Sequence, residues 1–207
     1  QCLVGSEMCI RDRFTGMRRG EICGLRWSDI DFNASTISVN RTVEYIPHEG
    51  LIFTAPKTKA SNRTFKVGAN CMDMLREYQL YQKAERLRVG SMWARTVQVE
   101  NGKTVQNDLL FTSWDGTPFD LERLTTWFPH FLRAHDLPAV HFHSLRHTYA
   151  SLMIAAHVPI TTVSGRLGHA QTSTTTDIYA GFIRTADAAA SDAMEIVFDN
   201  IREKSRA

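Results

Sequence analysis

The spacing of apolar residues changes along this chain, and that change limits the folds it can adopt. Apolar and polar residues alternate over residues 36–40, which predicts a strand, and residues 43–46, 51–54 and 64–67 are further short runs of this kind. We expect the run at 64–67 to pair with that at 51–54 across a polar turn at 57–62. Beyond these runs, the pattern is mainly helical. The sequence therefore predicts an α+β domain that is mainly α-helical, with a small antiparallel β-sheet near the N-terminus.

The expected helices have apolar faces or recognisable ends. Asp120 is placed to cap one helix, and Gly168 to end another that begins after Pro159. The segment at 91–107 is polar and has no clear pattern. The helices are expected over residues 18–25, 69–88, 120–134, 144–156, 160–167, 173–181 and 184–203.

Composition narrows the class of protein without identifying it. The 207 residues carry a net charge of +2, which argues only weakly for nucleic acid, so local clusters must carry that case. No run approaches the roughly 18–20 apolar residues of a membrane span. The four cysteines form no C-x-x-C pair, so neither a zinc site nor a disulfide framework is expected. We expect instead a reduced, cytoplasmic chain in which Cys23 and Cys71 are buried.

The first 13 residues do not fit the rest of the chain. They show no hydrophobic period and no signal-peptide core, and they resemble a translated sequencing adapter. We therefore expect residues 1–13 to be a non-native scar and residues 14–207 to form one domain.

Four short islands of functional residues stand out. They are residues 15–21, 56–63, 143–147 and 167–169, the last followed ten residues later by Tyr179. In order they supply an arginine, a lysine, a His-x-x-Arg motif, a histidine and a tyrosine. From about residue 14 to 185 the chain resembles the catalytic domain of the tyrosine recombinases, the phage integrase family.

This resemblance implies a site-specific DNA recombinase that forms a 3′-phosphotyrosine through Tyr179, for integration or excision of a mobile element. Arg18 and Arg146 would hold the scissile phosphate, a task that suits the two-pronged guanidinium. His143 would assist proton transfer, and His169 would hydrogen-bond the phosphate. Taken alone, without the other islands, Arg18 is better explained as a surface arginine paired with Glu21 three residues on.

Basic residues gather between the third and fourth expected strands and in the fourth. By the resemblance, Lys57 protonates the leaving 5′ oxygen, with Lys59 as the alternative. Lys57, Lys59, Arg63 and Lys66 lie within ten residues with no acid among them, a pattern typical of phosphate-backbone contacts. The acids Glu21, Asp29 and Asp31 are expected to orient arginines or to cap turns.

The resemblance also implies partners. They are double-stranded DNA and a homotetramer on paired sites, with residues 184–203 docking on a neighbouring protomer or packing within their own domain. No metal, nucleotide or other cofactor is expected, because a phosphotyrosine conserves the bond energy. The family's N-terminal DNA-binding domain and the leading helix of its catalytic domain are not visible in the sequence, so we expect weak strand exchange from this fragment.

Two functions of other classes stay open on the residues alone. A zinc hydrolase has candidate ligands in His141, His143, His147 and His169, but Ser144 stands where an H-E-x-x-H motif has glutamate. A non-catalytic DNA-binding protein has no physical need for the tyrosine. Metal content distinguishes the first from a recombinase, and covalent attachment to DNA distinguishes the second.

Overall fold

The computed structural model of the chain describes residues 15–46, 48, 50–56, 58–99 and 103–180. The expected scar at 1–13, the proposed acid Lys57 and the expected helix at 184–203 lie outside the described residues.

The described elements follow the predicted order, and the bounds of the predicted helices and strands differ from the observed ones by no more than about two residues. Residues 172–180 are also helical, and a hairpin occupies part of the polar segment at 91–107. The helices are α2 (Arg19–Cys23), α3 (Ala69–Val89), α4 (Leu121–Ala134), α5 (Phe142–Ala155) and α6 (Ile160–Leu167), with 3-10 turns η1 (Trp27–Asp29), η2 (Lys59–Ser61) and η3 (Gly90–Met92). The strands are β1 (Ile30–Asp31), β2 (Thr36–Val39), β3 (Thr42–Ile46), β4 (Gly50–Thr54), β5 (Arg63–Lys66), β6 (Thr96–Gln98) and β7 (Thr104–Gln106).

The strands form three small antiparallel sheets among the described residues, and one predicted pairing is wrong. β5 does not pair with β4 but with β2, which also pairs with β1. Strands β3 and β4 pair only with each other. The register sets Phe65 opposite Ile37, and both side chains are buried. This pairing buries an apolar pair, which stabilises the register.

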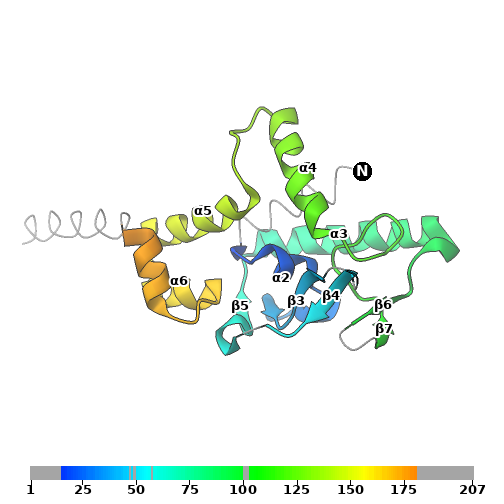
Figure 1. The fold of residues 1–207 in the computed structure, drawn as a ribbon, viewed down its shortest axis with the longest axis horizontal. Coiled ribbons are helices and arrows are strands. Elements are labelled where there is room, and N and C mark those ends of the chain that lie inside the picture. The colour runs from blue at the N-terminus through cyan, green and yellow to red at the C-terminus, as the bar shows by residue number, and fades with distance from the viewer. Residues whose placement is uncertain (1–14, 47, 49, 57, 100–102, 181–207) are drawn as a thin grey trace, which may run out of the picture.

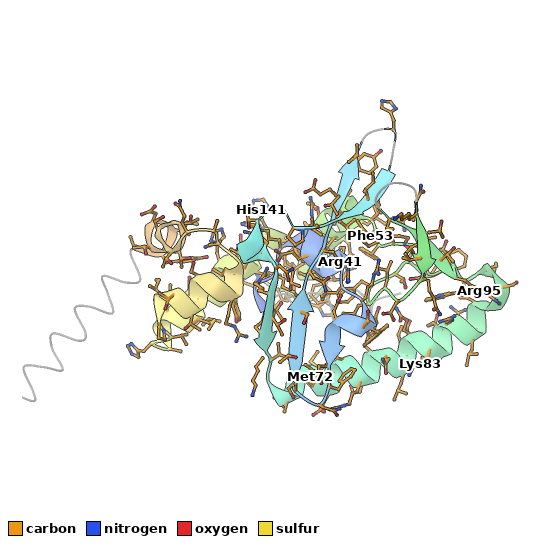
Figure 2. All side chains as sticks on the ribbon, turned by 90° about the horizontal axis from the view of Figure 1, so that it is seen from below. Arg41, Phe53, Met72, Lys83, Arg95 and His141 are labelled. Carbon is orange, nitrogen blue, oxygen red and sulfur yellow. The ribbon has the colours of Figure 1, made fainter. Side chains whose placement is uncertain are left out.

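A large hydrophobic cluster joins the strands to the helices. Figures 1 and 2 show α3 lying along one side of the strands, and Met72, Leu75 and Tyr78 on this helix are buried in the cluster. Cys23 and Cys71 are buried in the same cluster, as predicted. None of the helices described here is long and apolar enough to span a membrane.

A second, smaller cluster lies at the other end of the molecule. It joins α5, α6 and residues 172–180, and Figure 1 shows α6 beside strand β5, which it contacts. Helix α5 belongs to both clusters, because Phe142 packs in the first and Tyr149, Ala150 and Ile154 pack in the second. The middle of α5 is therefore the junction between the two parts of the domain.

Two helix ends behave as the sequence predicts. The Asp120 carboxylate accepts a hydrogen bond from the Glu122 backbone N–H at 2.9 Å and caps α4. Gly168 ends α6 in the left-handed conformation, with φ of 66°. The second of these ends lies at the candidate active site.

Candidate active site

Arg146 is a buried charge in the middle of α5, at the junction of the two clusters. Only 4% of it is exposed. Its guanidinium donates to the Gly16 carbonyl at 2.6 Å and to the Leu167 carbonyl at 2.7 Å. Burial, and then the charge of Arg18, lower the pKa of Arg146 to about 10, so it stays cationic at neutral pH. These two bonds use only part of its five N–H donors, and the rest can serve an anion.

Two glycines let the backbone approach the arginines of this site closely. Gly16 has φ of 62°, and a Cβ there would lie 2.4 Å from Cδ1 of Tyr149. Gly168 has φ of 66°, and a Cβ there would lie 2.7 Å from Nη1 of Arg63. Both positions require glycine, for its left-handed backbone and for its lack of a side chain.

Arg18 approaches the same place from the N-terminus of α2. Its guanidinium donates to Glu21 Oε1 at 2.9 Å and to the Gly168 carbonyl at 3.2 Å, and its side chain is 41% exposed. The charge of Arg18 also contributes to lowering the pKa values of Arg146 and His169. The pairing with Glu21 that the sequence allowed is therefore formed, and it holds Arg18 beside Arg146.

Glu21 is the acid that organises these arginines, in agreement with the role expected from the sequence. Its carboxylate accepts bonds from the Arg18 backbone N–H at 2.8 Å and from both terminal nitrogens of Arg63, at 2.8 and 3.1 Å. Burial alone would raise the pKa of Glu21, but the bond and charge of Arg63, with those of Arg18, bring it below the ordinary value. Glu21 is therefore an anion inside the protein.

Arg63 lies inside the protein instead of on its surface. Its side chain is 7% exposed, and its Nε donates to the Arg166 carbonyl at 2.7 Å. This placement argues against the direct DNA contact expected from the sequence. Arg63 instead ties β5 to Glu21 and to the end of α6.

An open groove of about 800 Å³ adjoins the arginines. Arg18, His143 and Arg146 line it, together with side chains from β3 and α4.

Tyr179 faces the junction from residues 172–180. Its hydroxyl lies 3.0 Å from Nδ1 of His147, and the residue is only 4% exposed. Burial raises the pKa of Tyr179, and the charge of Arg146 opposes that rise only in part. The phenol is therefore protonated at neutral pH and must lose its proton if it attacks phosphorus.

His169 follows directly after the end of α6. Its Nδ1 lies 2.7 Å from the hydroxyl of Thr175, a fully buried residue. Burial, followed by the charges of Arg146 and Arg18, lowers the pKa of His169 to about 4. At neutral pH the ring is thus uncharged, and if the Thr175 hydroxyl donates to Nδ1, the proton sits on Nε2, where it can bind a phosphate oxygen.

His143 and His147 lie one turn apart on α5, with ring centroids 5.0 Å apart. Burial, followed by the charges of His147 and Arg146, lowers the pKa of His143. His143 lines the groove, whereas His147 contacts the tyrosine. The histidine expected from the sequence to assist proton transfer is therefore not the one that touches the phenol in this structure.

The basic residues of the β4–β5 connection are described only in part. Lys57 lies outside the described residues, and of Lys59 only its place in η2 is described. Lys66 lies on β5 with an exposed side chain. The choice of general acid and the DNA contact of Lys66 stay predictions.

Sequence reasoning did not assign a role in the recombinase site to His147 or Thr175. Both were detectable from helical spacing: His147 lies four residues after His143, and Thr175 lies four residues before Tyr179. Residues at this spacing share a helix face, so each is expected beside its partner.

The described histidines are not grouped as zinc ligands would be. No group of three or more metal-binding side chains occurs among the described residues. Nδ1 of His147 is engaged by Tyr179, and Nδ1 of His169 by Thr175. The donor geometry thus gives no support to the hydrolase alternative.

The described domain is mainly helical with small sheets, and it brings arginines, histidines and a tyrosine together at one junction. The chain is a member of the phage integrase family, whose family model matches residues 13–182. The family and the α+β fold predicted from the sequence are both confirmed.

Similar proteins include named recombinases. The chain is 35% identical over 177 residues to a "Tyrosine recombinase XerC-like" protein of Caldanaerobacter subterraneus subsp. tengcongensis, a match that covers 82% of this chain and 43% of that protein. It is 26% identical over 165 residues to the ICEBs1 integrase of Bacillus subtilis, with coverage of 80% and 41%. The chain thus spans less than half the length of these two relatives.

Solved structures share the fold. The integrase of the Tn1549 transposon, in complex with transposon right-end DNA, superimposes with a TM-score of 0.71 at 19% identity and covers 89% of this chain, which in turn covers 57% of that chain. The XerA recombinase gives a TM-score of 0.59 at 21% identity, with coverage of 90% and 62%.

Proposed function

We propose that this chain is the catalytic part of a site-specific DNA recombinase that breaks and rejoins strands through a covalent bond between Tyr179 and a 3′ phosphate. The observation that carries the proposal is the position of the Tyr179 hydroxyl, 3.0 Å from an imidazole nitrogen and within the field of buried Arg146. Integration or excision of a mobile element is the biological process that such a reaction serves.

The arginines supply the electrostatic part of this reaction. Cleavage passes through a five-coordinate phosphorus on which negative charge builds up. Arg146 is buried and fixed by backbone carbonyls, and Arg18 is held by Glu21, so neither side chain must be ordered when charge develops. Such preorganised donors are often the largest contribution to catalysis. His169, neutral and with Nε2 available, is assigned a further bond to the phosphate.

The remaining roles are assigned by membership of the family. Lys57, or Lys59 in its place, protonates the leaving 5′ oxygen, and His143 contacts the phosphate from the groove. The partners are double-stranded DNA and three further copies of the protein on paired sites, and the place of action is the cytoplasm. Structural neighbours solved with DNA support the DNA partner.

The test is covalent trapping on a nicked suicide duplex that loses its 5′ hydroxyl after cleavage. The wild-type protein is expected to give a protein–DNA band that survives denaturation, and Tyr179→Phe is expected to give none while binding DNA as before. Tyr81→Phe, a tyrosine change on α3, is the matched control and should leave the band intact. An undiminished band in Tyr179→Phe refutes the assignment.

A further inference from the structure

We infer that His147 is a catalytic residue, the group that accepts the phenol proton of Tyr179 during attack. This inference rests on the proposed function, since it takes Tyr179 as the nucleophile. It assigns to His147 the proton transfer that the sequence pattern gave to His143. The observation behind it is the contact of 3.0 Å between the Tyr179 hydroxyl and His147 Nδ1.

The positions of His147 and Tyr179 on their helical segments bring the two side chains into contact. His147 lies directly after Arg146 on α5, and Tyr179 lies on the buried face of residues 172–180, four residues after fully buried Thr175. The two rings are 5.9 Å apart between centroids. Among the described residues, His147 is the hydrogen-bond partner of the Tyr179 hydroxyl, and His143 makes no such bond.

The reaction needs a base at this hydroxyl. At pH 7 only about one free tyrosine in a thousand is ionised, and burial of Tyr179 makes ionisation harder. Arg146 has only donors and cannot take the proton. A neutral imidazole can, and a positioned base typically contributes about 10²–10⁴-fold to such a step.

The proton and electron balance is complete. The Tyr179 oxygen forms a bond to phosphorus as the bond from phosphorus to the 5′ oxygen breaks. The phenol proton passes to His147 Nδ1, and the 5′ oxygen takes a proton from the general acid, assigned to Lys57. In the rejoining step a 5′ hydroxyl attacks phosphorus and gives its proton to the general acid, which lost one in the first step, while His147 returns its proton to the departing Tyr179 oxygen.

A second buried tyrosine shows what a merely structural contact looks like here. The Tyr149 hydroxyl accepts a hydrogen bond from Arg166 Nε at 2.7 Å. Arginine can hold that hydroxyl but cannot take a proton from it. The partner of Tyr179 differs from that of Tyr149, because an imidazole nitrogen can both hold the hydroxyl and accept its proton.

The experiment compares His147→Asn and His147→Ala with wild type in single-turnover cleavage of the suicide duplex, using the protein as its gene encodes it. Asparagine keeps an acceptor near the position of Nδ1 but is not a base. Both variants are expected to cleave at least about 100-fold more slowly with unchanged DNA binding. Added imidazole should restore part of the rate of His147→Ala. His157→Asn, at an exposed histidine after α5, is the matched control and should cleave like wild type.

Each result decides between the alternatives. Cleavage by His147→Asn within about threefold of wild type overturns the inference, because a hydrogen bond alone then suffices. Loss of cleavage in His143→Asn but not in His147→Asn overturns it as well. If His147→Ala does not fold, the asparagine variant still decides. No covalent band from the wild-type protein overturns the proposed function itself and this inference with it.

Discussion

His169 and Thr175 show how burial sets the protonation state of a residue in the candidate active site. With a pKa near 4, His169 is neutral at physiological pH and can give the phosphate only one proton, from one nitrogen. Thr175 lies 2.7 Å from the other nitrogen. If the Thr175 hydroxyl donates to this nitrogen, Thr175 is a positioning residue that favours the tautomer with the proton on Nε2.

Thr175→Val tests this role with little change in volume. A typical hydrogen bond contributes about 1 kcal/mol, so loss of the tautomer preference is expected to slow covalent cleavage by roughly 5- to 10-fold. Nitrogen chemical shifts of the His169 ring provide the direct readout, since they distinguish the two tautomers. Thr176→Val, at an exposed neighbour, is the control. Unchanged ring shifts in Thr175→Val would show that the hydroxyl does not set the tautomer.

The sequence predicted a residue's place in the site well where the order of motifs indicates it, and poorly where it depends on contacts with distant parts of the chain. The motif order identified Arg18, Arg146 and Tyr179, which the structure brings to one junction. The DNA contact of Arg63 stays a prediction, but the sequence shows its charge and not its burial: only the fold reveals that Glu21, 42 residues away, accepts its hydrogen bonds. A basic residue in a basic cluster looks like a DNA contact until its partner is known.

At the scale of elements, the C-terminus of α6 depends on a single backbone conformation. Gly168 turns the chain so that the carbonyls of Leu167 and Gly168 face Arg146 and Arg18. A side chain at Gly168 meets the Arg63 guanidinium as well. The end of this helix is therefore part of the site and not only its boundary.

Two glycine substitutions in and after the same helix should have opposite effects on stability. Gly168→Ala is expected to lower the free energy of unfolding by about 1–2 kcal/mol, because alanine is strained at positive φ. Gly165→Ala, within α6 and with open space around its Cβ, is expected to raise it by about 0.5–1 kcal/mol. Urea unfolding of both variants checks this. Equal effects of the two would contradict the assigned role of Gly168.

The strand pairing shows where element-level prediction failed. Alternation identified the strands, since the inward residues of β2 and β5 are buried as a period of two requires. It did not identify partners, because one alternating run fits any other of similar length. Nearness in sequence favoured the pairing of β4 with β5. In the structure β5 pairs with β2, and the buried residues Ile37 and Phe65 lie opposite each other.

At the scale of the whole molecule, the site lies at the junction of two hydrophobic clusters that share α5. Main-chain carbonyls from both sides, of Gly16 and Leu167, accept bonds from Arg146. Because Tyr179 is only 4% exposed, either the segment at 172–180 shifts or the phosphate enters the junction before attack. Burial at this junction also lowers the pKa of His169, and we expect this to make the stability of the protein sensitive to acid.

The pH dependence of stability follows from the lowered pKa of His169. Unfolded histidine takes up a proton near pH 6.5, whereas folded His169 does so only near pH 4. The unfolded state therefore binds more protons in this window, and the free energy of unfolding should fall as pH drops through it. His143 acts in the same direction. Urea midpoints from neutral pH to about pH 4.5 should decline less steeply in His169→Gln, and a wild-type slope in that variant would contradict the origin of the effect.

The central claim is that the Tyr179 oxygen becomes bonded to DNA, and mass spectrometry of the trapped complex tests it most directly. Trypsin should release residues 167–184 as one peptide, in which Tyr179 is the only tyrosine. After nuclease digestion we predict a residual 3′-nucleotide on this peptide, with fragment ions that place it on Tyr179. A nucleotide on any other residue, or an unmodified 167–184 peptide from a trapped complex, would contradict the account.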